Sequence, residues 1–299
     1  MTDLVELHDV DITIKRNHIL KHFSLTIGDT PKVIGLIGLN GAGKTTFIKS
    51  IFGDYDIREG EVNRLSKSIA FCTDVPDFPS HLTALEILKY SRWLFSGSQK
   101  NDEYYLETLD KVGLGRSAYR TVEHFSRGMK QRLGIASSLV LEPKLIFFDE
   151  PTSALDPKGR EDVINIMKEL GKEMVVVFSS HILSDVEKIA EELIVIHKGE
   201  KIYEGNLSHL LETTPNHQKA FLMFSSEEAQ EKFLKEYRGS VIFKVESKKE
   251  LSFSAEDFYQ VLAALNQETP VGLQSIRKEA VTLEDAFDYL VGSREEKTS

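Results

Sequence analysis

Short apolar segments alternate with longer amphipathic stretches along the first part of the chain. The segments 32–38, 144–150 and 173–181 are almost continuously apolar, as expected of strands that are buried on both faces of a sheet. Each segment ends in polar or glycine residues, and open α/β sheets bind ligands at the carboxyl ends of their strands. The alternation predicts an α/β fold with a mostly parallel sheet, crossover helices and a ligand site at one edge.

Two neighbouring regions follow different patterns. Residues 4–14 alternate apolar and polar positions, and together with residues 23–28 they predict an antiparallel β layer. Between Pro76 and Arg132 the apolar positions recur at helical spacing. This spacing predicts a helical insertion over about residues 76–140.

A polar stretch with a proline, residues 212–218, interrupts the pattern, so we expect one domain at 1–211 and a second at 212–299. The second region reads strand, helix, strand, strand, helix, strand, which is typical of a small α+β ferredoxin-like module. A last amphipathic helix is expected after it. The expected strands are 220–225, 240–246, 251–255 and 273–281, and the expected helices are 227–238, 257–267 and 283–292.

Composition excludes several classes of protein. The chain has 299 residues, 41% hydrophobic and 28% charged, which is enough for one large or two modest domains. A formal net charge of −10 argues against duplex nucleic acid as the main ligand, because phosphate neutralisation requires clustered Lys and Arg. Cys72 is the only cysteine, so no internal disulfide forms and a reducing cytoplasmic setting fits. No apolar run reaches the ~18 residues of a membrane span, so any membrane role must come through a partner.

The segment GLNGAGKT, residues 38–45, matches the GxxxxGK[ST] pattern between a predicted strand and an apolar helix. Glycines let successive backbone N–H groups converge on an anion, and the helix N-terminus adds positive potential. Lys44 is expected to reach the β- and γ-phosphates and the Thr45 hydroxyl to bind Mg²⁺. The pattern predicts a nucleoside triphosphate site. Its expected contacts are Asn40, Gly41, Ala42, Gly43, Lys44, Thr45 and Thr46.

Three further polar residues are expected at the same edge of the sheet. Asp149 follows an apolar run and is expected to hold Mg²⁺, while Glu150, pointing to the other side, is free to polarise an attacking water. His181 ends another apolar segment, where it can contact the γ-phosphate. The alternatives are an ordinary strand end for the two acids and a structural role for the histidine.

A second glycine-containing loop, FSRGM, lies inside the predicted helical insertion. Ser126 and Gly128 precede an amphipathic helix, whose N-terminus can bind phosphate. This loop lies in a different part of the predicted fold from the first, so one nucleotide is not expected to contact both loops of one chain. In a head-to-tail pair of chains, the second loop of each chain can contact the nucleotide bound by the first loop of the other. The alternative is an ordinary helix N-cap, with Ser126 as the cap and Arg127 solvated.

Five motifs, in their order along the chain, resemble those of the ABC transporter ATPase family, over about residues 1–211. GLNGAGKTT is similar to its Walker A loop, FSRGM to its signature loop, LIFFDEP to its Walker B strand, SALD to its D-loop and SSHIL to its switch histidine. The resemblance implies ATP and Mg²⁺ as ligands, Glu150 as general base, His181 as γ-phosphate sensor and Asp156 as a signal across a dimer interface. It also implies that Ser126, Arg127, Gly128 and Met129 contact the partner's ATP, and that the helical insertion moves cytoplasmic loops of membrane subunits.

Three positions depart from the family pattern. Ile14 stands where an aromatic side chain usually stacks on adenine, so an apolar contact remains without ring stacking. Asp74 stands at the Q-loop glutamine, where a carboxylate can bind Mg²⁺ but cannot donate an amide hydrogen bond. Arg127 replaces a small signature residue, and it either adds positive charge near the partner's ATP or points to solvent.

The C-terminal VTLEDAFDYLVG resembles the ending of ATPase subunits of exporters with a separate membrane polypeptide, which handle drugs, antimicrobial peptides, lipids or polysaccharides. It also fits a plain amphipathic helix covering a small sheet. We expect a motor ATPase at the cytoplasmic face of the membrane, paired as a homodimer or paralogous heterodimer on integral membrane permease subunits. A soluble ABC-type ATPase acting on ribosomes or DNA is the alternative. One cassette, the lack of sustained heptads and the acidic charge all disfavour it.

Overall fold

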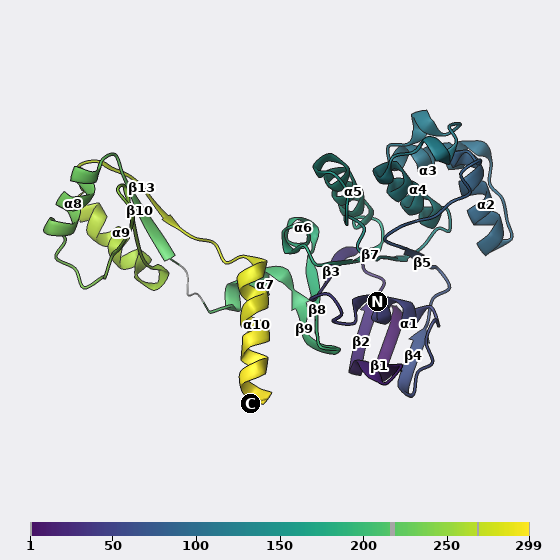
Figure 1. The fold of residues 1–299 in the computed structure, drawn as a ribbon, viewed down its shortest axis with the longest axis horizontal. Helices are drawn as coiled ribbons and strands as arrows, with labels where there is room; N and C mark the ends of the chain where they lie inside the picture. Colours follow the sequence, from purple (N-terminus) through teal and green to yellow (C-terminus); the bar gives the residue numbers. More distant parts are fainter. Residues whose placement is uncertain (1, 216–218, 268, 299) are drawn as a thin grey trace. The chain divides into compact units, whose positions relative to one another are not determined.

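The computed structural model describes residues 2–215, 219–267 and 269–298. The chain divides into two compact units, Met1–His209 and Leu210–Ser299, coloured from purple to green and from green to yellow in Figure 1. Each unit has its own sheet or sheets and its own hydrophobic core.

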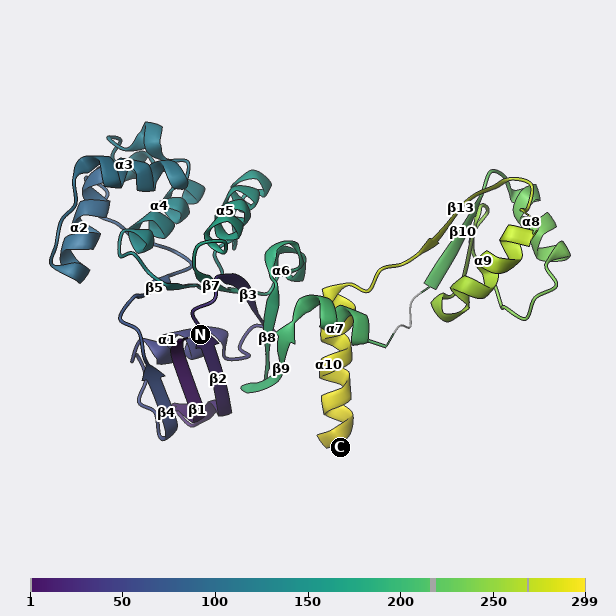
Figure 2. The ribbon, with the colours of Figure 1, turned by 180° about the vertical axis from the view of Figure 1, so that it is seen from behind.

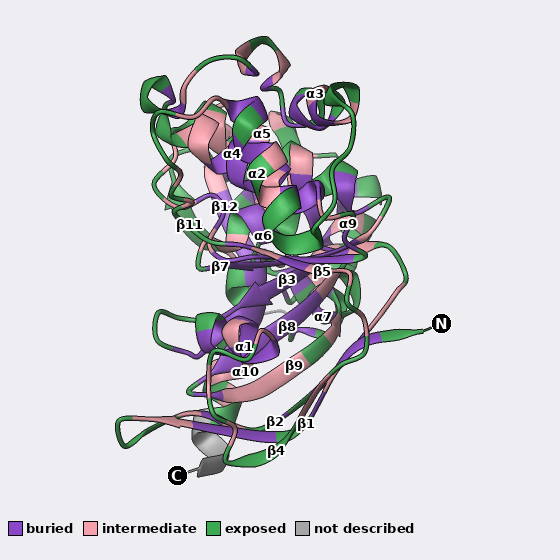
Figure 3. Cartoon of the chain, turned by 90° about the vertical axis from the view of Figure 1, so that its right-hand side faces the viewer, coloured by how far each residue is buried: buried purple, intermediate pink, exposed green. Residues whose placement is uncertain are grey.

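A six-stranded sheet forms the centre of the first unit, in the order β5-β6-β7-β3-β8-β9. The first five strands in this order pair in parallel, and β9 closes one edge antiparallel to β8, which confirms the predicted mostly parallel sheet. Every residue of β6 and β7 is buried, because helices and a second sheet cover both faces; β7 is purple in Figure 3. The strands are β3 Lys32–Ile37, β5 Ile69–Cys72, β6 Leu145–Phe148, β7 Val175–Ser180, β8 Glu192–His197 and β9 Glu200–Asn206.

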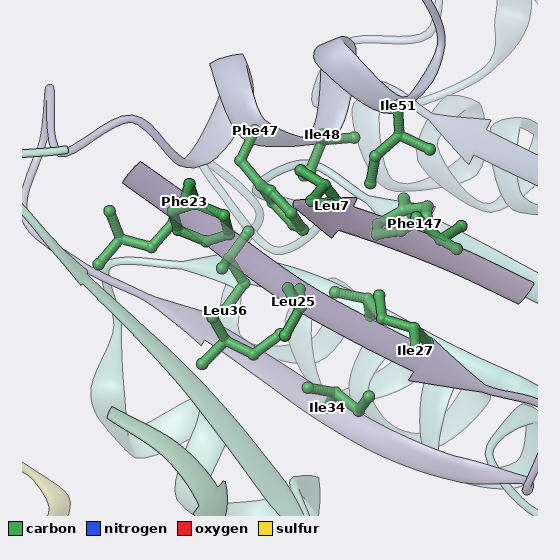
Figure 4. Packing of buried hydrophobic residues seen from close by; sticks show 14 of the residues in the cluster. Leu7, Phe23, Leu25, Ile27, Ile34, Leu36, Phe47, Ile48, Ile51 and Phe147 are labelled. Atoms are coloured by element: carbon green, nitrogen blue, oxygen red, sulfur yellow. The ribbon is translucent and has the colours of Figure 1, made fainter. Parts of the chain in front are cut away.

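The predicted antiparallel layer is confirmed as a separate sheet in the order β2-β1-β4. It comprises β1 Asp3–Ile14, β2 Asn17–Gly28 and β4 Glu59–Arg64. Helix α1, Lys44–Ile51, packs between this layer and the central sheet, and Phe47 of α1 contacts Phe23 and Phe147 at ring-centroid distances of 5.0 and 6.3 Å (Figure 4). The helix that follows the glycine-rich loop is therefore held in the core of the unit.

The predicted helical insertion is also present. It contains α2 Ala84–Ser96, α3 Asp102–Lys111 and α4 Arg127–Leu139. Thr83 and Glu86 form a reciprocal capping box at the start of α2, which satisfies two of its free N–H groups. Helices α4, α5 and α6 cover the face of the central sheet opposite α1 (Figures 1 and 2). The remaining helices of this part of the chain are α5 Pro157–Leu170, α6 Leu183–Ile189 and α7 Leu207–Thr213.

The second unit has the predicted ferredoxin-like arrangement. Its sheet has the order β11-β12-β10-β13, and all of its pairings are antiparallel. The strand expected from residue 240 begins only at Lys244, because Val241 and Phe243 pack into the core instead of extending the ladder. Its elements are β10 Lys219–Phe224, α8 Glu227–Glu236, β11 Lys244–Ser247, β12 Glu250–Ser254, α9 Phe258–Gln267, β13 Leu273–Lys278 and α10 Leu283–Thr298. None of the helices in the described residues is long and apolar enough to cross a bilayer.

Candidate nucleotide-binding site

The loop between β3 and α1 is shaped by glycines and tied to the turn after β8. Gly41 and Gly43 have φ angles of 80° and 113°, a left-handed region that other residues rarely enter. The Gly199 N–H donates to the Ala42 carbonyl at 3.0 Å, and a Cβ on Gly38 would lie 2.4 Å from the carbonyl oxygen of Ile196. The loop is thus closely packed underneath, whereas Asn40 and Gly41 at its tip are exposed.

The N-terminus of α1 has no side-chain cap. Gly43 is the N-cap residue, and the first turn carries no acidic residue, so neither a cap nor an acid of this turn occupies its N–H groups. Thr45 is exposed in this turn, whereas Thr46 faces the core. Uncapped N–H groups at a helix N-terminus bind anions such as phosphate.

Lys44 is 6% exposed, and its ammonium group folds back over its own loop. Its Nζ donates to the Gly38 carbonyl at 2.7 Å and lies 3.5 Å from Glu150 Oε1. A buried ammonium requires such partners, and the carbonyl holds the charge at the mouth of the loop. The structure therefore brings the predicted phosphate-binding lysine and the predicted general base into contact.

The two acids after β6 have different side-chain partners, and the Ser179 hydroxyl contacts both residues. The Ser179 hydroxyl donates to Asp149 Oδ1 at 2.7 Å and accepts from the backbone N–H of Glu150 at 2.8 Å. Asp149 is 7% exposed, and its own N–H donates to the Cys72 carbonyl at 3.0 Å. The serine was not among the predicted site residues. The signal was a polar side chain inside the buried run that ends in His181.

Glu150 has a left-handed backbone with φ 47°, an uncommon conformation for a residue with a side chain. Its Oε2 lies 2.7 Å from His181 Nδ1, and its Oε1 lies 3.5 Å from Lys44 Nζ. The Glu150 side chain is 20% exposed and that of His181 45%, so the pair is open to solvent on one side. Lys44, Glu150 and His181 thus form one continuous polar chain.

The second predicted loop lies elsewhere in the same unit. Ser126 is the N-cap of α4, and its hydroxyl accepts from the Met129 N–H at 3.2 Å, as the N-cap alternative predicted. Within the described part of the chain, no hydrogen bond or ion pair links residues 126–129 to residues 38–46. Asp156 is the N-cap of α5 and accepts from Gly159 N–H at 3.3 Å.

The departures Asp74 and Arg127 meet at one pocket of about 260 Å³. Asp74 lies two residues after the end of β5, at the same edge as the carboxyl end of β6, and Arg127 opens α4. The pocket is lined by Asp74, Val75, Pro76, Phe125, Arg127, Lys130 and Gln131. The third departure, Ile14, ends β1 opposite Asn17 and packs against the core of the first unit.

Comparison with known proteins places these features in a family. The family model described as ABC transporter matches residues 20–153. The uncharacterised ABC transporter ATP-binding protein YxlF of Bacillus subtilis (strain 168) is 32% identical over 284 residues, covering 91% of this chain and 94% of YxlF. The chain belongs to the ABC transporter ATP-binding proteins. It binds ATP, and it hydrolyses ATP as a subunit of a transporter.

Two further comparisons agree with membership of the ABC transporter family. The lantibiotic transport ATP-binding protein SrtF of Streptococcus pyogenes is 38% identical over 203 residues, covering 64% of this chain and 86% of SrtF. A solved ATP-binding subunit of an ABC transporter is 28% identical with a TM-score of 0.60, and the match covers 70% of this chain and 92% of that one.

The residues of this ABC transporter ATPase fit a nucleotide with a divalent cation. The α1 N-terminus has no side-chain cap, so its first backbone N–H groups can bind phosphate. Thr45 and Asp149 supply the hydroxyl and carboxylate oxygens that Mg²⁺ prefers, and both stand at the carboxyl edge of the central sheet. Asp74 brings a further carboxylate to that edge.

Proposed function

We propose that this ABC transporter ATPase is the motor subunit of an exporter and that Glu150 is its general base. The contact chain from Lys44 through Glu150 to His181 is the observation that carries the proposal. A carboxylate held between an ammonium group and an imidazole is oriented before substrate arrives, and an oriented base needs little rearrangement in the transition state.

When the triphosphate binds, the Lys44 ammonium group must give up its hydrogen bond to the Gly38 carbonyl and bind phosphate instead. Its Nζ now donates to Gly38, and the same short reach brings it to phosphates held by the N–H groups of residues 40–46. Thr45 and Asp149 hold Mg²⁺, which neutralises phosphate charge when bound, and Asp74 is a further ligand. Ile14 contacts the base through its apolar side chain.

Hydrolysis uses the two residues at the open side of the site. Glu150 accepts a proton from the attacking water through a carboxylate oxygen. His181 already uses Nδ1 on Glu150, so its other ring nitrogen serves the γ-phosphate. Release of Lys44 from Glu150 frees that carboxylate to act as a base.

A second ATPase subunit, identical or paralogous, supplies the residues that one chain cannot. Ser126, Arg127, Gly128 and Met129 start α4, and Asp156 starts α5. A Cβ on Gly128 would lie 3.9 Å from Gly159 Cα, so the two helix starts are neighbours. Their adjacency supports one shared face that caps the partner's ATP.

The helical insertion offers a surface for the membrane subunits. Tyr90, Trp93, Leu94 and Phe95 of α2 are 50%, 55%, 54% and 73% exposed, an unusual density of apolar side chains for a water-facing helix. Phe95 also lines a pocket of about 490 Å³ together with Phe52, Phe71 and Phe78. We assign this surface to cytoplasmic loops of separately encoded integral membrane permease subunits, which hold the ATPase at the cytoplasmic face of the membrane.

Two similarities to other proteins suggest the class of molecule that is transported. SrtF is named for lantibiotic transport, and the resemblance of the C-terminal helix points to exporters of drugs, antimicrobial peptides, lipids or polysaccharides. Within this set we favour antimicrobial peptides. No nucleic acid partner is expected, since the net charge of −10 opposes phosphate backbones.

The test uses Glu150→Gln, with Glu173→Gln as the matched control on an exposed ion pair. We expect Glu150→Gln to keep ATP binding, to lose at least about 100-fold in turnover, and to shift from monomer to dimer in light scattering only with Mg-ATP. The control should hydrolyse ATP normally. Full activity in Glu150→Gln would remove the base role, and bound ATP without a mass shift would contradict the shared site.

A further inference from the structure

Two histidines and two aspartates meet on the β1–β2 hairpin, outside the nucleotide-binding site. His22 Nδ1 lies 2.9 Å from Asp9 Oδ1 and 3.5 Å from Asp11 Oδ2. One donor atom from each of these three residues lies within 4.8 Å of the other two. His18 Nε2 contacts Asp11 Oδ1, the other oxygen of the same carboxylate.

These separations match the first coordination shell of a transition metal. With metal–ligand bonds of about 2.0–2.2 Å, neighbouring ligand atoms at octahedral or tetrahedral angles stand roughly 2.8–3.6 Å apart. The distances of 2.9 and 3.5 Å from His22 to the two aspartates lie within that range. All three donor atoms lie within 4.8 Å of one another, so one ion can be placed between them.

Asp11 is a buried carboxylate whose charge has no permanent cation nearby. It is 7% exposed, and its described partners are the rings of His18 and His22 and the backbone N–H of His22 at 3.3 Å. No Lys or Arg forms an ion pair with Asp9 or Asp11 among the described residues. Burying an ionised carboxylate is costly without a counter-charge, and a second carboxylate beside it raises that cost.

The hairpin backbone turns these side chains together. Asp9 and His22 both have left-handed φ angles, 49° and 46°, and the β1–β2 register shifts on either side of Val10. Bulges of this kind re-aim side chains that a regular ladder would point to opposite faces or spread along the strand. Asp9 and Asp11, two positions apart on β1, and His22 on β2 supply the ligating atoms.

We propose that Asp9, Asp11 and His22 bind a divalent first-row transition metal, with Zn²⁺ as the reference ion and His18 as a positioning residue. An imidazole nitrogen with two carboxylates suits Zn²⁺ and its neighbours in the series better than Mg²⁺ or Ca²⁺, which take oxygen ligands. Three protein ligands leave an open position for water, and His18 orients Asp11 through its second oxygen. The ion ties β1 to β2 ahead of the turn that follows Ile14.

The test measures binding and stability without nucleotide. The full chain, without a histidine tag and after treatment with a chelator, is titrated with ZnCl₂ by calorimetry and by thermal unfolding. We expect one ion per chain and a rise in Tm of roughly 5 °C at a hundredfold excess over Kd. MgCl₂ at the same concentration should leave Tm unchanged. Substitution with Co²⁺ adds a ligand-field spectrum that reports the coordination directly.

Substitution of single histidines distinguishes the proposed metal ligand from the histidines near it. His22 is largely exposed, so His22→Ala should fold and should lose at least about 100-fold in Zn²⁺ affinity. His18→Ala should weaken binding by roughly 10-fold while one ion per chain still binds. His8→Ala is the matched control, because His8 lies on the same strand and pairs only with Glu6, at 3.2 Å, among the described residues. It should bind like the wild type.

A Tm unchanged by Zn²⁺ would overturn the proposal. The positive charge beside Asp11 would then be that of a protonated His22. An equal response in wild type and His22→Ala would overturn it as well, because the ion would then bind elsewhere. Neither outcome bears on the phosphate-binding residues of the nucleotide site, because Lys44, Asp149, Glu150 and His181 lie outside the β1–β2 hairpin.

Discussion

Helices α1 and α4 begin in different ways, although each follows a glycine-containing loop. The N-cap of α1 is Gly43, which offers no side chain to the first turn. The N-cap of α4 is Ser126, whose hydroxyl already accepts from the N–H of Met129 at 3.2 Å. The start of α1 thus leaves its N–H groups for a ligand, whereas the start of α4 satisfies one of its own.

The two loops also differ in how closely the rest of the protein packs against them. A Cβ on Gly38 would strike the Ile196 carbonyl at 2.4 Å, whereas one on Gly128 would have only Gly159 within contact distance, at 3.9 Å. The first loop is built into the core, and the second lies on an open surface. The first loop can therefore hold phosphate within a single chain, whereas under the proposed function the second gains a phosphate only through a second chain.

Removing the cation of the complete site should give the largest effect. Lys44→Ala should lower ATP affinity and reduce turnover by at least about 100-fold, because Lys44 carries the ammonium group that is proposed to bind the phosphates. Lys49→Ala, in the last turn of the same helix, is the control. Fluorescence titration with labelled ATP and a phosphate-release assay measure both effects. Normal turnover in Lys44→Ala would place the phosphates elsewhere.

Adding a methyl group to each loop should separate packing from partner contact. Gly38→Ala should lower the free energy of unfolding by about 1–3 kcal/mol, because the new Cβ meets backbone. Gly128→Ala should leave stability equal or up to about 1 kcal/mol higher, yet lower ATP-dependent dimer formation. Urea unfolding and light scattering report the two quantities. Equal destabilisation by both substitutions would end the contrast between the loops.

Removing the cap should have a smaller effect. Ser126→Ala should cost about 1 kcal/mol of stability and also lower the ATPase rate of the dimer. Ser226→Ala is a matched control, since Ser226 caps α8 with the same 3.2 Å bond to the N–H of Ala229 but lies in the second unit. It should lose similar stability and keep its ATPase rate. If both variants keep that rate, Ser126 is a cap and nothing more.

The smallest effect concerns the thiol beneath α4. Burial raises the pKa of Cys72 to about 12, because desolvation disfavours the thiolate, and a Cβ on Gly134 would lie 3.2 Å from its sulfur. At pH 8 the thiol is therefore protonated and should react with Ellman's reagent far more slowly than in 6 M urea. Rapid reaction in the folded protein would show that α4 opens readily from the central sheet.

Patterns along the chain predicted most of the fold because they report burial. The apolar runs of β3, β6 and β7 identified the central sheet, and parallel strands bring their carboxyl ends to one edge, which gathers Lys44, Asp149, Glu150 and His181. The strand expected from residue 240 began too early, since an apolar residue can enter the core without joining a ladder.

Contacts that depend on pairs of side chains could not be predicted in this way. Ser179 holds Asp149 and Glu150 through one hydroxyl, and Arg127 lines a pocket with Asp74 although the two are more than 50 positions apart. Neither arrangement can be predicted from the spacing of residues along the chain. Both depend on side-chain rotamers and on backbone turns in the folded structure.

The sequence alone determined which residues can meet a triphosphate, since the glycine spacing and strand order of a P-loop are local properties. Only the tertiary structure decided that Glu150 spans from Lys44 to His181, and that Asp9, Asp11 and His22 converge on one hairpin. Both arrangements depend on left-handed residues at Glu150, Asp9 and His22. Such backbone states are too costly to arise locally, so they persist only where long-range packing holds them in place.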